Sequence, residues 1–486
     1  MPARPKTAAA PAARRLARAA AAAALGLAGL LSAACRRDPA DACRGMNVIW
    51  ISFDSVRADH CSFDGYARKT TPHLDALAAR GVRFPRSVAQ APYTLPSYAS
   101  MLTSRYVAEL AVHEQRDEKD ASKILGIAPG PSPQDELVSE ALRGAGYKTA
   151  AFVQSWISGP FGFDQGWDLF RHAQESLSQK MPHVLDWIEK NRSGRFFVFL
   201  YATDTHYPFL HAHERTNRFG KFASSFEFTL DAIERVRAGS LHPTPDDVAN
   251  AMAMYDEGLY WADQDLEPLF AYLDRTGLAQ RTIVVFNADH GEEFDEHGVI
   301  SHGQTYFDGV VRTPLVIAAP GLGRPGRAES QLVQNLDVAP TLLDLVGVER
   351  PRAWSGRSLA PAVLGLPEAA SEPPRPAYSE GAWTFWIGSV VEGDRKFILV
   401  TPQERMLYDL AKDPGETSNL AGNDPDRVRT LYHTLMKHLG GPSGWLAPGP
   451  DHAPTYETWM KQVMGHYGLG EQSDVVKELR ALGYLH

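Results

Sequence analysis

The sequence predicts an α/β fold, with a largely parallel central sheet flanked by helices and a small C-terminal α+β subdomain. Two observations lead to this prediction. Short apolar runs, typical of strands that are buried on both faces, alternate along the chain with longer amphipathic segments. Several of these runs are followed by acidic or histidine side chains, and ligand groups collect beyond the carboxyl ends of strands in parallel sheets.

The first strand is expected at 46–53, where a continuous apolar run reaches Phe53 and stops at an acidic residue. A helix is expected at 71–81, because this segment opens on Thr and closes on Gly. A long amphipathic helix is expected at 250–275. Runs rich in branched and aromatic residues predict further strands at 149–153, 196–201, 282–287 and 312–319.

The chain changes in character after a Pro-rich segment at 371–376. A strand is expected at 396–400, and turn residues follow it at 413–416. We therefore expect two folded parts, a main domain at 46–370 and a small C-terminal subdomain at 377–425. The tail at 426–486 has no predicted structure.

The N-terminus has the composition of a bacterial secretion signal. Residues 1–18 carry five basic side chains and no acidic one, and an uninterrupted run of Ala, Leu and Gly follows at 19–31. Cys35 comes after three small residues, as in exported lipoproteins. We expect a signal peptide at 1–35, a tether at 36–45, and a lipid on Cys35 that anchors the protein in the membrane of the cell envelope. Cleavage without lipidation and a retained Ala-rich segment are the alternatives.

Composition limits the classes of partner. The chain has 486 residues and a net charge of −9, with no basic stripe in the expected mature part, which argues against a nucleic-acid partner. Its three cysteines, Cys35, Cys43 and Cys61, form no zinc-type cluster. A disulfide between the last two would require an oxidising compartment, and the sequence leaves it open. Nothing in the sequence indicates an oligomeric state.

The segment at 91–106 contains a helix start at Thr94. Pro96 suits the first turn of a helix, where its missing N–H costs nothing. The Thr94 hydroxyl would then lie near unpaired backbone N–H groups at the positive end of the helix dipole, which is a site for a tetrahedral anion. An ordinary N-cap threonine is the alternative interpretation.

Four residues with metal-binding side chains follow three of the expected strands. Asp54 follows the first strand, His206 follows another, and Asp289 and His290 follow a third. Because the carboxyl ends of parallel strands meet at one edge of a sheet, we expect these side chains to gather there.

The segment at 91–106 also resembles the nucleophile signature of the sulfatase family, within the alkaline-phosphatase superfamily. The matching residues are Pro96, Ser97, Leu102, Thr103, Arg105 and Tyr106. Thr94 stands where that family has the Cys or Ser that becomes formylglycine, and Tyr98 stands where it has Arg. Branches of the superfamily that transfer phosphoryl groups use a Thr at this position. The resemblance continues from about 47 to 419.

The resemblance implies an alkaline-phosphatase-like fold and a set of site residues. It implies a divalent metal ion, Ca²⁺, Mn²⁺, Mg²⁺ or Zn²⁺, whose ligands would be Asp54, Thr94, Asp289 and His290. It implies catalytic roles for Thr94, His206 and His302, and His302 stands where the family has a Lys. A second metal site formed by Asp204, His206 and His302 is the alternative use of these histidines.

Further departures from the family concern charge. Ser55 stands where many sulfatases have a second acid. Gln154, Ser155 and Trp156 stand where the family's Gly-Lys-Trp-His-Leu-Gly stretch supplies a Lys and a His to sulfate. The cationic grip on a sulfate group is therefore expected to be weaker here.

From these features we expect an exported, metal-dependent hydrolase that cleaves sulfate or phosphate esters of a small molecule, glycan or lipid through Thr94. A threonine ester has no second hydroxyl with which to expel sulfate, so phosphoesters are expected to turn over faster than aryl sulfates. The alternatives are a phosphoryl- or phosphoglycerol-type transferase or a phosphodiesterase acting on a cell-envelope component, and a non-catalytic binding lipoprotein.

Overall fold

In the computed structural model, the part of the chain that contains the predicted strands begins at Cys43. The residues that the structure describes are 41–110, 113–116, 124–128, 130–209, 216–220, 224, 226–322, 324–370, 373–381, 387–400 and 404–439. The expected signal peptide and Cys35 lie outside these ranges. Cys43 and Cys61 are buried free thiols, so the disulfide that the sequence leaves open is not formed.

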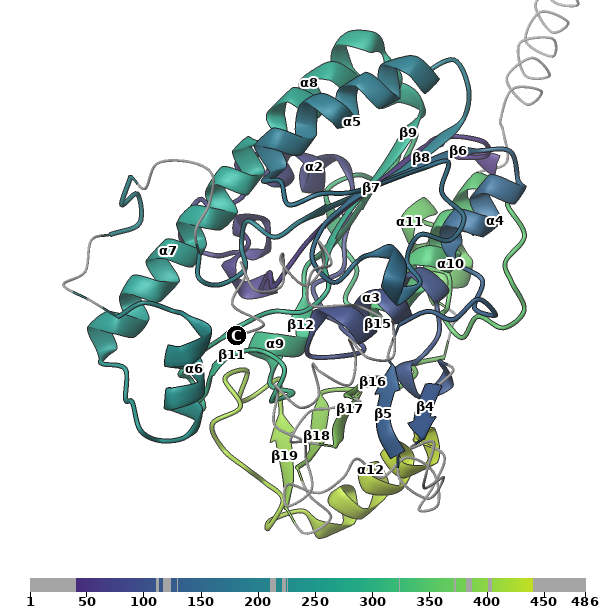
Figure 1. Ribbon diagram of the computed structural model, residues 1–486. Helices are drawn as coiled ribbons and strands as arrows, with labels where there is room; N and C mark the ends of the chain where they lie inside the picture. Colours follow the sequence, from purple (N-terminus) through teal and green to yellow (C-terminus); the bar gives the residue numbers. More distant parts are fainter. Residues whose placement is uncertain are drawn as a thin grey trace, which may run out of the picture. The chain divides into compact units, whose positions relative to one another are not determined.

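An eight-stranded sheet forms the centre of this unit, in the order β14-β2-β13-β9-β1-β8-β6-β7 (Figure 1). Its strands are β1 (Asn47–Phe53), β2 (Val82–Arg83), β6 (Lys148–Val153), β7 (Leu169–His172), β8 (Phe196–Ala202), β9 (Thr282–Ala288), β13 (Leu315–Ala318) and β14 (Arg327–Ala328). The neighbours from β9 to β7 all run parallel, whereas β13 is antiparallel to β9 and β2. The predicted largely parallel sheet is confirmed.

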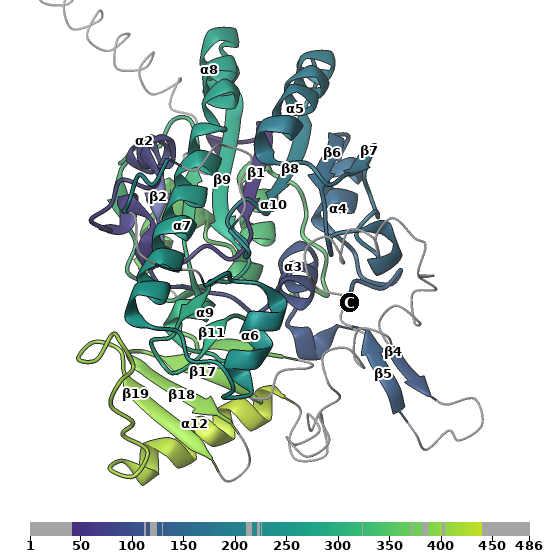
Figure 2. The same cartoon turned by 60° about the vertical axis from the view of Figure 1, so that its left-hand side comes forward.

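Helices cover both faces of this sheet (Figures 1 and 2). One face packs against α2 (Pro72–Arg80), α5 (Leu177–Asn191), α7 (Pro245–Gln264) and α8 (Glu267–Thr276). The other face carries α3 (Thr94–Thr103), α4 (Val138–Gly144), α10 (Val338–Val346) and α11 (Ala360–Leu364). Every residue of β1, β8 and β9 is buried, which explains why these strands are almost entirely apolar.

Proline interrupts two of the predicted elements. The expected helix at 250–275 is α7 followed by α8, and Pro268 lies in the first turn of α8. Proline has no N–H with which to continue the hydrogen-bonding pattern of the preceding helix. The expected strand at 312–319 is split at Pro314 into β13 and β12 (Arg312–Thr313), which belongs to a different sheet.

A four-stranded antiparallel sheet follows near the C-terminus, as the small subdomain requires. Its elements are β16 (Ala377–Glu380), β17 (Gly388–Glu392), β18 (Arg395–Leu399), β19 (Arg405–Asp409) and the covering helix α12 (Pro425–His438). Phe397 packs towards α12, whereas the next residue, Ile398, packs against α9 (Asp308–Val311) of the main domain. No element was predicted where α12 lies.

Short elements connect these layers. One small sheet joins β12 to β3 (Ser87–Val88) and β15 (Val333–Gln334), and two antiparallel pairs are formed by β4 (His113–Arg116) with β5 (Ile124–Ala128) and by β10 (Glu293–Phe294) with β11 (Ile300–Ser301). The helix α6 (Leu230–Arg237) contacts β11. Among the described residues, no helix combines the length and the apolar character needed to cross a bilayer.

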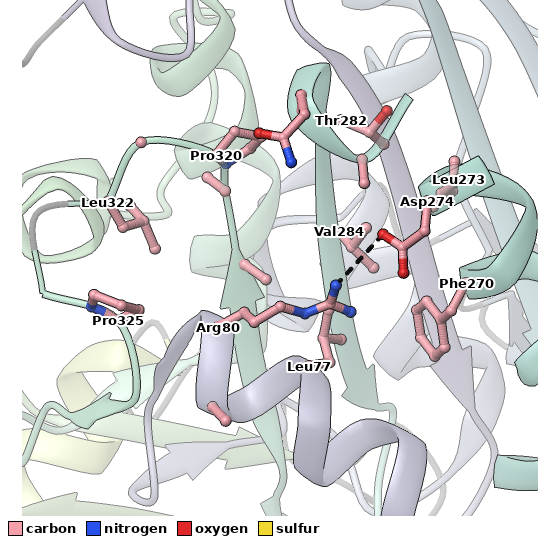
Figure 3. A pocket seen from close by; sticks show the side chains of 16 residues that line it. Leu77, Arg80, Phe270, Leu273, Asp274, Thr282, Val284, Pro320, Leu322 and Pro325 are labelled. Atoms are coloured by element: carbon pink, nitrogen blue, oxygen red, sulfur yellow. Dashed lines mark ion pairs between the residues drawn. The ribbon is translucent and has the colours of Figure 1, made fainter. Parts of the chain in front are cut away.

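A groove of about 290 Å³ lies between α2, α8 and the loop after β13 (Figure 3). Leu77 and Phe270 line it, and Arg80 and Asp274 face each other across it with nitrogen and oxygen 3.7 Å apart. Thr282, the first residue of β9, also lines the groove. The groove is therefore at the amino end of the parallel strands, opposite the end at which the predicted site residues emerge.

Candidate active site

Three neighbouring parallel strands deliver the predicted site residues to one edge of the central sheet. The last residues of β1, β8 and β9 are paired in register. Asp54, directly after β1, therefore emerges beside Asp289, directly after β9, although the two lie far apart in the sequence. The segment that follows β8 contains His206 and leaves the sheet at the same edge.

Asp54, Asp289 and His290 form a compact, buried group. One potential ligand atom from each residue lies within 4.8 Å of the other two. Nε2 of His290 lies 3.6 Å from Oδ1 of Asp54 and 3.4 Å from Oδ2 of Asp289. Two carboxylates and one imidazole suit a divalent cation. In the described part of the chain, no other acidic, histidine or cysteine side chains are gathered in this way.

His290 is oriented so that Nε2 turns its lone pair to the two carboxylates. Its Nδ1 lies 2.9 Å from the carbonyl oxygen of Gly291, which can only accept a hydrogen bond. The ring proton is therefore on Nδ1. Burial lowers the pKa of His290 to about 4, so the ring is neutral near pH 7, as a metal ligand must be.

Asp289 has one buried oxygen without a hydrogen-bond partner. Its Oδ1 accepts from the backbone N–H groups of Ser55 and His290, at 3.1 and 2.9 Å, whereas Oδ2 accepts no hydrogen bond from the described residues. Burial and the neighbouring Asp54 raise the pKa of Asp289. A cation at this point would satisfy the oxygen and offset the repulsion, so the residues present fit a metal ion.

Ser55 and Tyr201 hold the carboxylate of Asp54, and neither was predicted to do so. The Ser55 hydroxyl donates to Oδ1 of Asp54, 2.7 Å away, and the Tyr201 hydroxyl donates to Oδ2. Ser55 has a φ of 58°, a left-handed conformation that brings its N–H to Asp289. Ser55 therefore binds both carboxylates, in addition to removing the charge of the family's second acid. A tyrosine near the end of an otherwise apolar strand is the signal from which the second partner could be predicted.

Thr94 is the first residue of α3, and Tyr93 occupies the N-cap position. The N-cap interpretation of Thr94 is therefore wrong. Thr94 is 2% exposed, and its Oγ1 lies 3.3 Å from Nε2 of His290, so the hydroxyl borders the acidic group. Ser97, one turn further along, donates from its hydroxyl to the carbonyl oxygen of Asp289, 2.7 Å away, and so fixes α3 against the site.

Tyr98, at the position of the motif arginine, supplies no positive charge. Its hydroxyl lies 2.8 Å from the hydroxyl of Ser52, and its ring packs with the centroid 5.1 Å from that of Tyr201. The side chain is completely buried. Tyr98 therefore packs against the ends of the strands and fills the position of the motif arginine with an uncharged aromatic ring.

His206 and His302 lie beside the acidic group. The ring centroid of His302 is 4.3 Å from that of His290 and 5.0 Å from that of His206. Nδ1 of His206 donates to the carbonyl oxygen of Tyr207, 2.6 Å away. Burial lowers the pKa of both His206 and His302, so both rings are neutral near pH 7 and add no fixed charge.

Asp204 does not join these two histidines. Both of its carboxylate oxygens accept from the backbone N–H of Leu177 at the start of α5, at 3.3 and 3.2 Å. Its carboxylate therefore serves the first turn of a helix. The alternative second metal site formed by Asp204, His206 and His302 has no geometric basis in the described residues.

Gln154, directly after β6, binds a buried lysine. Nζ of Lys180 donates to the side-chain oxygen of Gln154 and to the carbonyl oxygen of Tyr201, 2.6 Å away. Lys180 is 1% exposed, and its charge opposes the effect of burial, which raises the pKa of Asp204 to about 6. This cation lies behind the strand ends and was not predicted, because a lysine in an amphipathic helix normally faces solvent.

A model of the sulfatase family matches residues 46–348 of the chain. A choline-sulfatase from Rhizobium meliloti is 34% identical, over 76% of this chain and 81% of that protein. The multifunctional alkaline phosphatase superfamily protein PehA from Trinickia caryophylli is 32% identical, over 36% of this chain and 37% of its own length.

Solved structures share the fold. The phosphonate monoester hydrolase of Agrobacterium radiobacter superposes with a TM-score of 0.65 at 21% identity, over 81% of this chain and 95% of that one. A 2-O GAG sulfatase superposes with a TM-score of 0.64 at 18% identity, over 81% of this chain and 92% of that one. These likenesses extend beyond the main domain, which confirms the predicted alkaline-phosphatase-like architecture.

Proposed function

The chain belongs to the sulfatase family, and from this premise we propose that it is a metal-dependent hydrolase that cleaves sulfate or phosphoryl esters with Thr94 as nucleophile. Relatives and solved structures include a choline-sulfatase and phosphonate monoester hydrolases, so both ester classes occur among similar proteins. The residues around Thr94 support a preference for one of these two classes.

One observation carries the proposal. The Thr94 hydroxyl lies 3.3 Å from Nε2 of His290, at the point where that nitrogen also faces both carboxylates. The hydroxyl is the side chain of the first residue of α3, where the helix dipole favours an anion. A nucleophile, a cation site and an anion site therefore coincide.

The chemistry follows from this placement. A cation held by Asp54, Asp289 and His290 would lower the pKa of the Thr94 hydroxyl and polarise the ester. The Thr94 oxygen attacks phosphorus or sulfur and forms a new ester bond, while the bond to the alcohol breaks. The neutral imidazole of His302 is the group proposed to take up the proton that the Thr94 hydroxyl releases and to deliver it to the alcohol oxygen. Water then cleaves the Thr94 ester and restores the hydroxyl.

The surroundings of Thr94 favour phosphoryl over sulfuryl transfer. A formylglycine gem-diol expels sulfate by losing a proton, whereas a threonine ester must be attacked directly by water. A phosphoryl group can follow that route when a metal and a helix N-terminus stabilise its charge. Tyr98 and the neutral rings of His206 and His302 add no fixed cation with which to compensate on sulfate.

The test compares ester classes on purified protein loaded with a defined divalent cation. Four substrates are assayed: 4-nitrophenyl sulfate, 4-nitrophenyl phosphate, 4-nitrophenyl phenylphosphonate and bis(4-nitrophenyl) phosphate. Each is tested with the wild type, Thr94→Ala and Thr94→Ser. We expect faster turnover of a phosphorus ester than of the sulfate. Thr94→Ala should lose activity on the order of 10³-fold or more, and Thr94→Ser should keep part of it.

The outcomes separate the alternatives. A clear preference for the aryl sulfate, or full activity in Thr94→Ala, contradicts the proposal. A metal-loaded protein that turns over none of the esters supports a binding lipoprotein instead. Transfer to an added alcohol that outpaces hydrolysis supports a transferase.

We further propose that the protein is exported and anchored through a lipid on Cys35. The support is the order of a basic segment at 1–18, an apolar run at 19–31 and small residues before Cys35. The substrate would then be an ester that is accessible in the cell envelope.

A further inference from the structure

Glu292 lies in the loop after β9 and is 1% exposed. Both of its carboxylate oxygens lie 3.2 Å from Nδ1 of His302. Its backbone is held on both sides, because its N–H donates to the carbonyl oxygen of Gly309 at 2.9 Å and its own carbonyl accepts from Arg57 at 3.0 Å. The carboxylate is therefore fixed beside His302 rather than free to turn away.

His302 is also held through its backbone. The carbonyl oxygen of His302 accepts from Nη2 of Arg237, on α6, at 3.1 Å. Ser301, the preceding residue, has a φ of 76°, so the chain turns sharply where β11 ends. The ring and the backbone of His302 are thus constrained by different segments, which is the support that a catalytic side chain needs for a defined orientation.

The hydrogen bond decides which nitrogen of His302 serves the substrate. Because Nδ1 is engaged by Glu292, Nε2 is the ring nitrogen left for another partner. The ring lies beside His290, which borders Thr94. This geometry resembles the arrangement in which a buried carboxylate orients an imidazole for proton transfer.

On the basis of the proposed function, we propose that Glu292 is a positioning residue, which holds His302 so that Nε2 is presented to the oxygen of the leaving alcohol. Because Nδ1 keeps the ring proton on the side of Glu292, Nε2 of the neutral ring first takes up the proton that Thr94 releases. It then passes this proton to the alcohol oxygen as the bond to phosphorus or sulfur breaks. Glu292 itself does not touch the ester.

The next residue provides a matched control. Glu293 is also 1% exposed and also binds a histidine, because one of its oxygens lies 3.0 Å from Nδ1 of His297. His297, however, lies 3.0 Å through Nε2 from the carbonyl oxygen of Gly415 and stacks on Phe307, with centroids 3.5 Å apart. The pair Glu293–His297 therefore joins the main domain to the C-terminal subdomain and has a structural role.

The experiment uses the metal-loaded protein and aryl phosphorus esters of graded leaving-group pKa. Glu292→Gln should lower kcat by about 10- to 100-fold for poor leaving groups and much less for 4-nitrophenolate, with KM changed by less than about twofold. In the double variant, adding Glu292→Gln to His302→Ala should lower kcat no further. The metal content of the Glu292→Gln protein should match that of the wild type. Glu293→Gln should leave kcat unchanged.

Three results would overturn the assignment. The first is a wild-type kcat in Glu292→Gln, and the second is that Glu292→Gln lowers kcat by the same factor in His302→Ala as in the wild type. The third is that the Glu292→Gln protein loses its metal. A second readout does not depend on turnover. In protein labelled with ¹⁵N-histidine, the ring resonances of His302 are assigned as those that are missing from the spectrum of His302→Ala. These resonances should shift in Glu292→Gln and stay in place in Glu293→Gln. Unshifted resonances contradict the positioning role even if esters are cleaved, whereas shifted resonances without any turnover contradict only the proposed function.

Discussion

The two carboxylates of the acidic group are satisfied to different extents. Both oxygens of Asp54 accept hydrogen bonds from neighbouring hydroxyl groups, whereas Oδ2 of Asp289 accepts none from the described residues. An unpaired buried oxygen costs free energy that a bound cation would recover. Asp289 is therefore the side chain on which cation binding depends most directly.

Replacing Asp289 by Ala should weaken metal binding on the order of 10²-fold or more, because a charged ligand is lost and none replaces it. Metal content after dialysis, measured by emission spectroscopy, checks this. Asp64→Ala is the matched control, since Asp64 is also largely buried but pairs with Arg83 at 2.9 Å, away from the site. Equal metal content in Asp289→Ala and wild type would refute the assignment.

At the level of helices and strands, the contact between the C-terminal sheet and α9 contains a buried charged side chain. Lys396 of β18 is completely buried, and its Nζ lies 2.8 Å from Asp308, at the start of α9, and 2.9 Å from Glu416. The two acids hold the pKa of Lys396 above its usual value despite burial. The Lys396 ammonium therefore adds an ionic contact between the subdomain and the main domain.

Lys396→Met should lower the free energy of unfolding by about 3–5 kcal/mol, because the buried Glu416 loses its cation and Asp308 keeps only its contact with Arg312, at 3.4 Å. Urea denaturation measures the change. Lys412→Met is the matched control, since Lys412 is 82% exposed and 3.7 Å from Asp409, and should cost less than about 0.5 kcal/mol. Equal effects of the two substitutions would show that the buried ion pairs do not stabilise the contact.

For the chain as a whole, the sequence predicts the elements that place the site better than the contacts that complete it. The runs at 46–53, 196–201 and 282–287 are recognisable because strands buried on both faces are apolar throughout, so their polar ends stand out. The contact of Tyr201 with Asp54 joins distant segments, and that of Glu292 with His302 crosses an irregular loop, so no periodicity in the sequence predicts either. Proline was overlooked at Pro268 and Pro314, where it overrides an otherwise continuous pattern.

Export leads to a prediction for the intact protein in its host. Cys35→Ala should abolish labelling by a fatty acid and move the protein out of the membrane fraction, because the thiol that would carry the lipid is absent. Cys43→Ala, which changes a buried thiol near the start of the folded unit, should leave both unchanged. Labelling that persists in Cys35→Ala contradicts lipidation at this residue.

The register of β1 and β9 has a thermodynamic consequence. Asp54 and Asp289 are neighbours only because two distant segments pair in the folded sheet, so a cation that bridges them acts as a cross-link that the unfolded chain cannot form. Such a ligand stabilises the folded state by an amount set by its concentration, about 2.7 kcal/mol at one hundred times Kd. The melting temperature therefore reports how full the site is, and heating the protein with Ca²⁺, Mg²⁺, Mn²⁺ or Zn²⁺ ranks these ions without any substrate.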